Sequence, residues 1–481
     1  MLVDLAADDG WEAPVGEAQA EVAIAGGGLA GLVLASRLAT LGKRVIVLEA
    51  ASAAEAAESQ ALYRAEQIGQ PTLPADETRL RWLGGSSNHW GGWCRPLAPE
   101  DMASRPGAEL PGWPFGPEAL APYLQPAAAL LGFAPPPPAG AALAGSEDLL
   151  APVSLAFSEP PFRAGEALLP GLAALPQVTL VLNAEVAGAA PDRQAGRLAH
   201  FVVGRRYGQR LWRVPARLLV LAMGAMENLR FLLALQRTLE ERLSALVGLG
   251  YMQHLHGRIG QLVRLTREPG PVLFDDGRPR FLETTAAFLA RHGSRARLYA
   301  EPADCADPAL GWLARLACAT DGVAHLRATA EQWPSRSSRL LLGEGADWLG
   351  RPPLVIDWRP GAGDKARLRQ AALAYGAWLA RTGGWRLRLA DWLLAEDAAL
   401  PLPDGADGGD RGAAGHQMGG ARTGLTPAAG VADPLGAVFG AGNLYLASTA
   451  LFAGSGHAPP TLTLVQLTLR LADSLAARLG G

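Results

Sequence analysis

Short apolar runs separated by a glycine-rich turn organise the first fifty residues. Residues 21–25 (EVAIA) are predicted to form a short buried strand, and residues 26–42 a glycine turn that leads into a helix. Residues 44–50 (RVIVLEA) form the next apolar run and predict a second strand. This strand–turn–helix–strand order is typical of a parallel α/β sheet.

The same patterning predicts elements along the rest of the chain. A fully buried strand that leads into a helix is expected at 218–235, and a sheet separate from the first is expected from strand-like alternation at 258–300 and 311–358. The other expected elements are strands at 177–188 and 198–222, a helix at 364–382, a strand and turn at 443–454, and a terminal helix at 460–479 that begins at a proline.

Other stretches lack periodicity. Residues 1–18 are polar and are expected to form a flexible arm, and residues 401–415 have the composition of a flexible linker. Residues 79–100 form a Gly/Trp/Ser-rich loop that is longer than a simple connection between two elements needs to be, which indicates a functional loop.

These elements predict an α/β fold, with a Rossmann-like first domain and a second, sheet-based (α+β) domain. A chain of 481 residues is long for a single core, which favours two interlocked domains. The expected segments are residues 1–105, 166–240 and 416–481 for the first domain, with 106–165 (a lid-like excursion) and 241–415 for the second.

Composition narrows the class of protein. A net charge of −3 gives no electrostatic reason to expect nucleic acid or an anionic membrane as partner. Cys94, Cys305 and Cys318 are too scattered for a disulfide framework, and no metal site is expected. The acidic N-terminal residues do not resemble a secretory leader, and no apolar run is long enough to span a membrane, so we expect a cytoplasmic protein. The abundance of Ala, Gly and Pro is typical of a GC-rich bacterial genome.

The glycine turn carries the first chemical signal. Gly26, Gly28 and Gly31 stand as G-x-G-x-x-G between the first strand and the helix. The first allows a tight turn, the second lets the backbone approach a pyrophosphate, and the third lets helix and strand pack closely. Glu49 ends the second strand, where a carboxylate can accept hydrogen bonds from ribose hydroxyls. This unit predicts a dinucleotide site but does not by itself distinguish FAD from NAD.

Three further segments of the sequence distinguish FAD from NAD as the predicted cofactor. Residues 84–96 (GGSSNHWGGWCRP), 221–233 (LAMGAMENLRFLL) and 416–473 follow the glycine loop in order. Together they resemble the glucose–methanol–choline (GMC) oxidoreductases, most of all the pyranose 2-oxidase and bacterial sugar/alcohol dehydrogenase branch. The resemblance implies that the first domain is a Rossmann-like FAD-binding domain and the second a sheet-based (α+β) substrate domain. It also implies FAD as cofactor, and oxidation of an alcohol by hydride transfer to the flavin. A second glycine loop for a nicotinamide is absent, which argues against a nicotinamide enzyme or monooxygenase.

The resemblance also implies roles for individual residues. His416 matches the catalytic histidine, which takes the hydroxyl proton. His89 matches a histidine bonded covalently to the flavin in pyranose 2-oxidases, although many relatives with similar loops bind FAD non-covalently. His254 matches a family histidine for which packing is the expected role. Further cofactor contacts are implied for Gly85, Ser86, Trp90, Asn443 and Pro460. Glu227 and Asn228 are read equally as nucleotide neighbours and as helix caps.

One position departs from the family. A second catalytic Asn or His normally precedes the last helix, and Pro459 stands there instead. His457, two residues upstream, is kept as a second candidate catalytic residue, although relatives that retain the asparagine also carry it. Three functions follow: oxidation of an alcohol or sugar-like hydroxyl with His416 as base, a repurposed dehydrogenation or non-redox elimination or cyclisation, or a non-enzymatic flavin-binding role. The small-molecule substrate and any electron-acceptor partner stay open.

Overall fold

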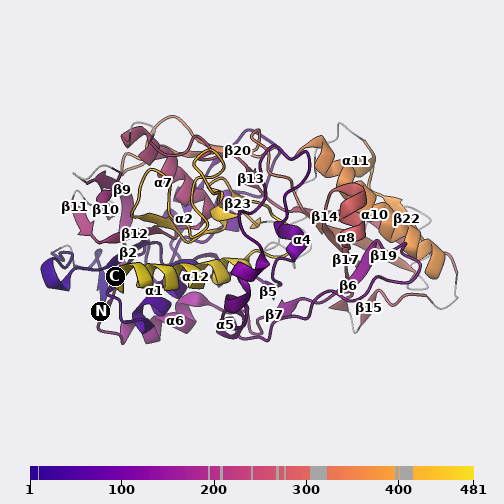
Figure 1. Ribbon diagram of the computed structural model, residues 1–481, viewed down its shortest axis with the longest axis horizontal. Coiled ribbons are helices and arrows are strands. Elements are labelled where there is room, and N and C mark those ends of the chain that lie inside the picture. Colours follow the sequence, from indigo (N-terminus) through magenta and orange to yellow (C-terminus); the bar gives the residue numbers. More distant parts are fainter. Residues whose placement is uncertain are drawn as a thin grey trace.

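The computed structural model describes residues 1–480 apart from 9, 193–195, 206–207, 209, 240–241, 267–269, 276–277, 304–321, 396–399 and 401–414. Cys305, Cys318 and all of the expected linker except Gly415 therefore lie outside the described residues. The molecule is elongated, with one large sheet toward each end of its long axis and both chain termini at the same end (Figure 1). Among the described helices, none combines the length and the apolar character that crossing a membrane would need.

A six-stranded sheet occupies the end that holds the termini. All of its pairings are parallel. In spatial order its strands are β1 (Leu2–Asp4), β8 (Val178–Leu182), β3 (Val45–Leu48), β2 (Val22–Ala25), β12 (Leu218–Leu221) and β24 (Leu444–Leu446).

Different elements cover the two faces of this sheet, which explains why its central strands are apolar at every position. On one face, Val22 and Ile24 share a core with α1 (Leu29–Thr40), α6 (Ala164–Ala173) and α12 (Thr461–Gly480). On the other face, Ala23 and Ala25 share a core with α7 (Gly224–Thr238) and with a three-stranded sheet. That sheet consists of β9 (Glu185–Pro191), β10 (Leu198–Gly204) and β11 (Leu211–Pro215).

The N-terminal segment corrects one expectation. Residues 1–18 were expected to be a flexible arm, but Leu2–Asp4 forms the edge strand β1, paired in parallel with Leu180–Leu182. Leu5 is fully buried and Trp11 is 9% exposed. The prediction was wrong because the apolar side chains that anchor this segment are few and find their partners only through a strand far along the sequence.

The second large sheet lies at the other end of the molecule (Figure 1) and is antiparallel throughout. Its strands in order are β22 (Trp385–Leu389), β14 (Leu255–Arg264), β19 (Val323–Ala330), β18 (Ala296–Pro302), β17 (Phe281–Thr284) and β6 (Leu150–Val153). Helix α10 (Ala362–Thr382) packs on it through Leu368, Tyr375 and Trp378, and α8 (Ala286–His292) through Phe288. The predicted α/β fold with a second, sheet-based unit is confirmed.

Smaller elements link the two sheets. β20 (Arg339–Leu342) and β21 (Leu354–Asp357) fall in the stretch expected to join the second sheet, but they form a separate three-stranded sheet in which β21 pairs with β4 (Glu66–Gln67). Two-stranded pairs are β5 (Trp93–Cys94) with β7 (Ala156–Phe157), β13 (Tyr251–Met252) with β23 (Met418–Gly419), and β15 (Phe274–Asp275) with β16 (Arg278–Pro279). Short helices are α2 (Ala57–Gln60), α3 (Ala75–Thr78), α4 (Pro99–Met102), α5 (Leu124–Leu130), α11 (Asp391–Leu394), η1 (Gly16–Ala18), η2 (Ala61–Tyr63), η3 (Gly85–Asn88), η4 (Pro117–Ala119), η5 (Ala121–Tyr123) and η8 (Thr449–Leu451).

The strands of the two sheets alternate along the sequence. The parallel sheet takes its strands from within 1–105, 166–240 and 416–481, and the antiparallel sheet from within 106–165 and 241–415. The chain thus crosses between the two units several times. The domain boundaries themselves stay predictions.

Candidate active site

One cavity of about 430 Å³ joins the glycine loop, where the nucleotide is predicted to bind, to His416, the predicted catalytic residue. Its walls come from the glycine loop, the 84–96 loop, the second sheet and the C-terminal block. Ten of the residues predicted from the sequence line it: Gly26, Gly28, Glu49, Gly85, Ser86, His89, Trp90, His416, Pro459 and Pro460. Gly31, Asn443 and His457 do not line it.

The glycine loop forms the nucleotide end of the cavity. Gly26 has φ +105°, and a Cβ there would lie 2.6 Å from the carbonyl oxygen of Ala222. A Cβ on Gly31 would lie 1.9 Å from the carbonyl oxygen of Gly26, so α1 can pack this closely only with glycine at that position. At Gly28, the N-cap of α1, a Cβ would enter the space in front of the helix, where the first N–H groups face the cavity.

Glu49 supports this loop directly. Its Oε2 accepts a hydrogen bond from the Gly27 N–H at 2.7 Å, and its Oε1 accepts one from the Ala51 N–H at 3.0 Å. Burial raises the pKa of Glu49, and these two backbone donors act against that rise. Each carboxylate oxygen keeps a second lone pair, so the same side chain can brace the loop and accept from a ribose hydroxyl.

Backbone geometry and side-chain bonds fix the 84–96 loop against the glycine loop. Gly84 and Gly85 both have positive φ, at 94° and 55°, and Gly84 forms a bridge with Gly28. Ser87 Oγ donates to the Gly84 carbonyl at 2.7 Å, and Trp90 Nε1 donates to the Phe162 carbonyl at 2.7 Å. These contacts hold the loop so that the side chain of His89 lines the cavity.

The protonation state of His89 follows from its surroundings. Burial, and then the nearby charge of Arg163, lower the pKa of His89. The imidazole is therefore neutral at pH 7, and one of its nitrogens carries a lone pair.

His416 contacts a second histidine that the sequence did not assign to the site. Its Nδ1 lies 2.8 Å from Nδ1 of His254, and Nε2 of His254 lies 3.2 Å from the carbonyl oxygen of Ser455. His254 is 5% exposed. Packing was the expected role of His254, but it also touches the residue predicted to be the base.

These contacts determine which nitrogens carry protons. A carbonyl oxygen only accepts, so Nε2 of His254 carries a proton and donates to Ser455. Burial lowers the pKa of His254 to about 3, so at pH 7 the ring is neutral and its Nδ1 is an acceptor. Nδ1 of His416 must then donate, which leaves the lone pair of a neutral His416 on Nε2.

Arg297 of β18 lines the same cavity, although it is only 2% exposed. Its Nη2 donates to Thr329 Oγ1 at 3.2 Å, and its guanidinium carbon lies 5.4 Å from the ring centroid of Phe281. Burial is the main cause of the lowered pKa of His254, and the positive charge of Arg297 adds to it. In the sequence, only a positive charge near the start of the run ARLYA marks this residue.

His457 lies in a buried ionic cluster away from the cavity. Its Nε2 is 3.3 Å from Glu283 Oε2, and the histidine is 1% exposed. Glu283 also contacts Arg295 at 3.0 Å and Arg95 at 3.6 Å. Burial acts to raise the pKa of Glu283, but the contact with His457 and the two arginines lower it to about 2. The structure therefore separates the two histidines that the sequence placed together as catalytic candidates.

Asn443 and Asn228 make contacts to the backbone. Asn443 Oδ1 accepts from the Leu198 N–H and its Nδ2 donates to the Leu198 carbonyl, both at 2.8 Å, so it joins the start of β10 to the start of β24. Asn228 Oδ1 accepts from the Met223 N–H at 3.0 Å, which is a cap at the start of α7. Its neighbour Glu227 instead lines the cavity.

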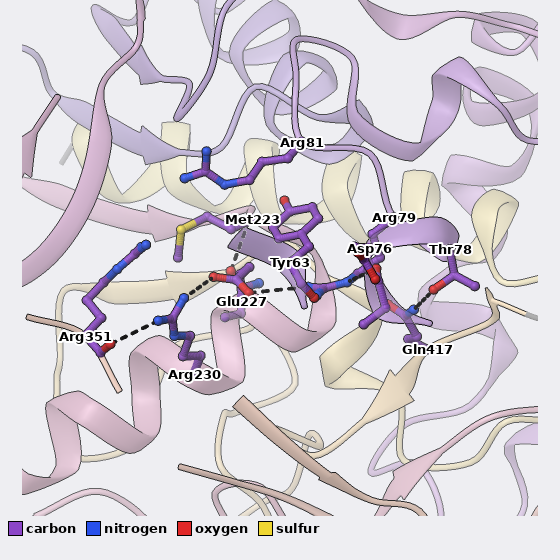
Figure 2. Close-up of polar contacts among 12 residues, drawn as sticks. Tyr63, Asp76, Thr78, Arg79, Arg81, Met223, Glu227, Arg230, Arg351 and Gln417 are labelled. Carbon is purple, nitrogen blue, oxygen red and sulfur yellow. Dashed lines mark hydrogen bonds and ion pairs between the residues drawn. The ribbon is translucent and has the colours of Figure 1, made fainter. Parts of the chain in front are cut away.

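Glu227 belongs to a chain of buried ion pairs beside the nucleotide end. Figure 2 shows it between Arg79, at 3.4 Å, and Arg230, at 3.5 Å, with Gln417 reaching Thr78 close by. The chain continues through further pairs, so that four guanidinium groups meet three carboxylates: Arg79, Arg81, Arg230 and Arg351 with Glu185, Glu227 and Asp347. Among these seven groups one positive charge is left over, and Glu49, which interacts with Arg81 and Glu185, balances it. Apart from Arg230 with Glu227 and Arg351 with Asp347, these pairs join residues far apart in the sequence, so the chain of pairs was not predicted from the sequence.

The residues present fit an FAD molecule. A glycine cradle at a helix N-terminus and a carboxylate at the end of the second strand suit the pyrophosphate and ribose. The cavity then continues to His89, His416 and Pro459, where a flavin ring would meet the two histidines.

Comparison with known proteins agrees with this geometry. Residues 334–468 match the GMC oxidoreductase family, and residues 19–73 match an FAD-binding domain. Pyridoxine 4-oxidase from Mesorbium loti superimposes with a TM-score of 0.56 at 20% identity, over 95% of this chain and 99% of that one. A variant of formate oxidase from Aspergillus oryzae RIB40, studied for its effect on FAD modification, superimposes with a TM-score of 0.59 at 16% identity, over 97% of this chain and 99% of that one. No curated protein matches the chain.

The fold and the cavity define an FAD-binding oxidoreductase. More particularly, residues 19–73 match an FAD-binding domain and residues 334–468 match the GMC oxidoreductases, which confirms the resemblance that the sequence predicted. Its place in the pyranose 2-oxidase branch stays a prediction.

Proposed function

We propose that the chain oxidises the hydroxyl group of an alcohol, with His416 as the general base. Bound FAD supplies the acceptor for the hydride that leaves the carbinol carbon. The observation that carries the proposal is the 2.8 Å contact between His254 and His416, the latter of which lines the same cavity as the glycine loop.

Four residues have defined roles in this proposal. Nε2 of His416 takes the hydroxyl proton, because the contact with His254 fixes the proton on the other nitrogen. His254, held by the Ser455 carbonyl, is a positioning residue. Arg297 supplies a positive potential that favours negative charge on the substrate oxygen. In this proposal His457 keeps Glu283 and its arginines in place and does not act on substrate.

Anaerobic reduction of the bound flavin tests this function. We expect that a panel of primary and secondary alcohols will contain members that bleach the flavin absorption in the purified protein. A panel in which none does so, while dithionite bleaches the same sample, would overturn the proposal. Readmitting oxygen, or adding a quinone, then identifies the electron acceptor.

A second candidate, dehydrogenation of a different substrate or a non-redox elimination, is favoured by Pro459. This residue lines the cavity without a hydrogen-bonding side chain. Pro459→Asn distinguishes the two candidates. Alcohol oxidation that increases tenfold or more means that the ancestral chemistry is still nearly in place, whereas flavin that no alcohol reduces in either protein favours the second candidate.

His89 lines the cavity as a neutral imidazole, which is the form that a bond to the flavin requires. We propose it as the residue through which a covalent link would form. Acid precipitation of the wild type and of His89→Ala decides the question. Colour that stays in the pellet for the wild type alone demonstrates the bond, and colour released from both shows that His89 only packs beside the ring.

A further inference from the structure

A second cavity of about 930 Å³ adjoins the one already described. Its described walls come from the proline-rich segment, β6 and β7, the β15–β16 hairpin, β17 and α10. The two cavities share Gly91 and Trp93, so a molecule held in the second can extend past Trp93 into the first. We call this second cavity the outer chamber.

Resting on the proposed oxidation of an alcohol, we infer that the outer chamber binds the apolar body of the substrate. The substrate is then an alcohol with a large hydrocarbon part rather than a sugar. Trp93, at the junction of the two cavities, is the residue that sets this preference.

The lining of the chamber supports an apolar occupant. Hydrocarbon and aromatic side chains dominate it, among them Leu273, Leu282, Phe281, Tyr375 and Trp378. The polar side chains of the lining are fewer, namely Ser154, Ser158, Glu159, Arg278 and Arg280, so a sugar that filled the chamber would lose more hydrogen bonds to water than the walls could replace. A volume of about 930 Å³ lies near the upper end of the usual range for ligand sites, which fits a bulky occupant.

The mouth of the chamber has the same character. Val272 is 55% exposed and Phe157 is 41% exposed, although both are large apolar residues that line the chamber. Exposed apolar side chains grouped at the mouth of a cavity mark a surface for an apolar ligand.

Trp93 is held in place by an aromatic cluster. Its ring centroid lies 5.2 Å from that of Phe157 and 5.4 Å from that of Phe281, both in edge-to-face geometry. The guanidinium carbon of Arg297 lies 5.8 Å from the Trp93 ring. Trp93 therefore contacts the aromatic wall of the outer chamber and also lies near Arg297, the charged group that is proposed to face the reacting hydroxyl.

The test compares alcohols of increasing apolar size on the flavin-loaded enzyme. For ethanol, hexanol and decanol, kcat/KM should increase by about fourfold for each methylene buried in the chamber. Glucose should be a poor substrate. A value of kcat/KM that is the same for ethanol and decanol, or highest for glucose, contradicts the inference.

Two variants locate the effect. Val272→Glu, at the exposed mouth, should lower the ratio of kcat/KM for decanol to kcat/KM for ethanol by about tenfold. Leu211→Glu is the matched control, because Leu211 is 58% exposed on β11 and does not line the chamber. Equal effects of the two variants on decanol would also overturn the assignment.

Binding separates failure of this inference from failure of the proposed function. Perturbation of the oxidised flavin spectrum reports alcohol binding without turnover. If decanol binds more tightly than ethanol, and Val272→Glu removes the difference, while no alcohol reduces the flavin, then the chamber stands and the function fails. If alcohols reduce the flavin without any dependence on size, the function stands and the chamber fails.

Discussion

The two ends of the cavity are built in opposite ways. At the nucleotide end, Gly26, Gly28 and Glu49 come from one contiguous strand–turn–helix–strand unit. At the redox end, His416 meets His254 across 162 residues, and Arg297 arrives from the second sheet. Local backbone geometry fixes the first end and the packing of two sheets fixes the second, so we expect substitutions to impair cofactor retention at one end and rate at the other.

The largest effect should come from Gly31→Ala at the nucleotide end. The added Cβ would lie 1.9 Å from the Gly26 carbonyl oxygen, so α1 must move away from the strand and the phosphate cradle opens. We expect the purified variant to carry essentially no flavin, measured as the flavin-to-protein absorbance ratio. Gly171→Ala in α6 is the control, because a Cβ there meets nothing within 4 Å. If Gly31→Ala keeps as much flavin as the wild type, the proposed difference between the two ends of the cavity is wrong.

At the redox end, His254→Leu should leave flavin content unchanged and slow anaerobic flavin reduction by about 10- to 100-fold. Leucine fills the space but cannot accept the proton of His416 Nδ1, so the correct tautomer of the base is no longer favoured. His254→Gln offers an amide oxygen in the same place and should recover most of the rate. If the leucine and glutamine variants are equally slow, His254 acts through packing alone.

The same contrast explains what could be predicted from the sequence. The 22–49 unit was predicted with its elements almost to the residue, because glycines and apolar runs act on their own neighbours. The strand at Leu2–Asp4 was missed because its partner Leu180–Leu182 lies far along the chain. His416 was found through its motif, but its contact with His254 was not, and His457 carried a motif yet lies against Glu283. Side-chain partners that only tertiary packing creates left no periodicity to detect.

A third expected effect concerns stability. His457→Gln should lower the free energy of unfolding by about 1–3 kcal/mol, because it weakens a contact to the buried Glu283 carboxylate. Thermal unfolding followed by flavin fluorescence measures it. Arg388→Gln is a control, since the ion pair of Arg388 with Asp391 is exposed on both sides. Equal stability of the two variants would mean that His457 does not support the buried cluster.

Measured per pH unit, the smallest effect is the change in how stability depends on pH. The folded protein holds His254 with a pKa of about 3 against an ordinary value of 6.5. Between these values the unfolded chain binds a proton that the folded chain does not, so stability is lost as pH falls from about 6.5 toward 3. His254→Leu should flatten this dependence by at most about 1.4 kcal/mol per pH unit. Urea unfolding at several pH values measures the slope, and identical slopes in the two proteins would contradict a neutral, buried His254.

The most direct test sets His416→Gln beside His457→Gln. With the alcohol that reduces the wild-type flavin fastest, at saturating concentration and without oxygen, the two variants are compared by stopped-flow absorbance. We predict that His416→Gln reduces its flavin about 10²- to 10⁴-fold more slowly than wild type, and that His457→Gln stays close to the wild-type rate. Equal rates for the two variants, or a slower His457→Gln, would contradict the assignment of His416 as the base.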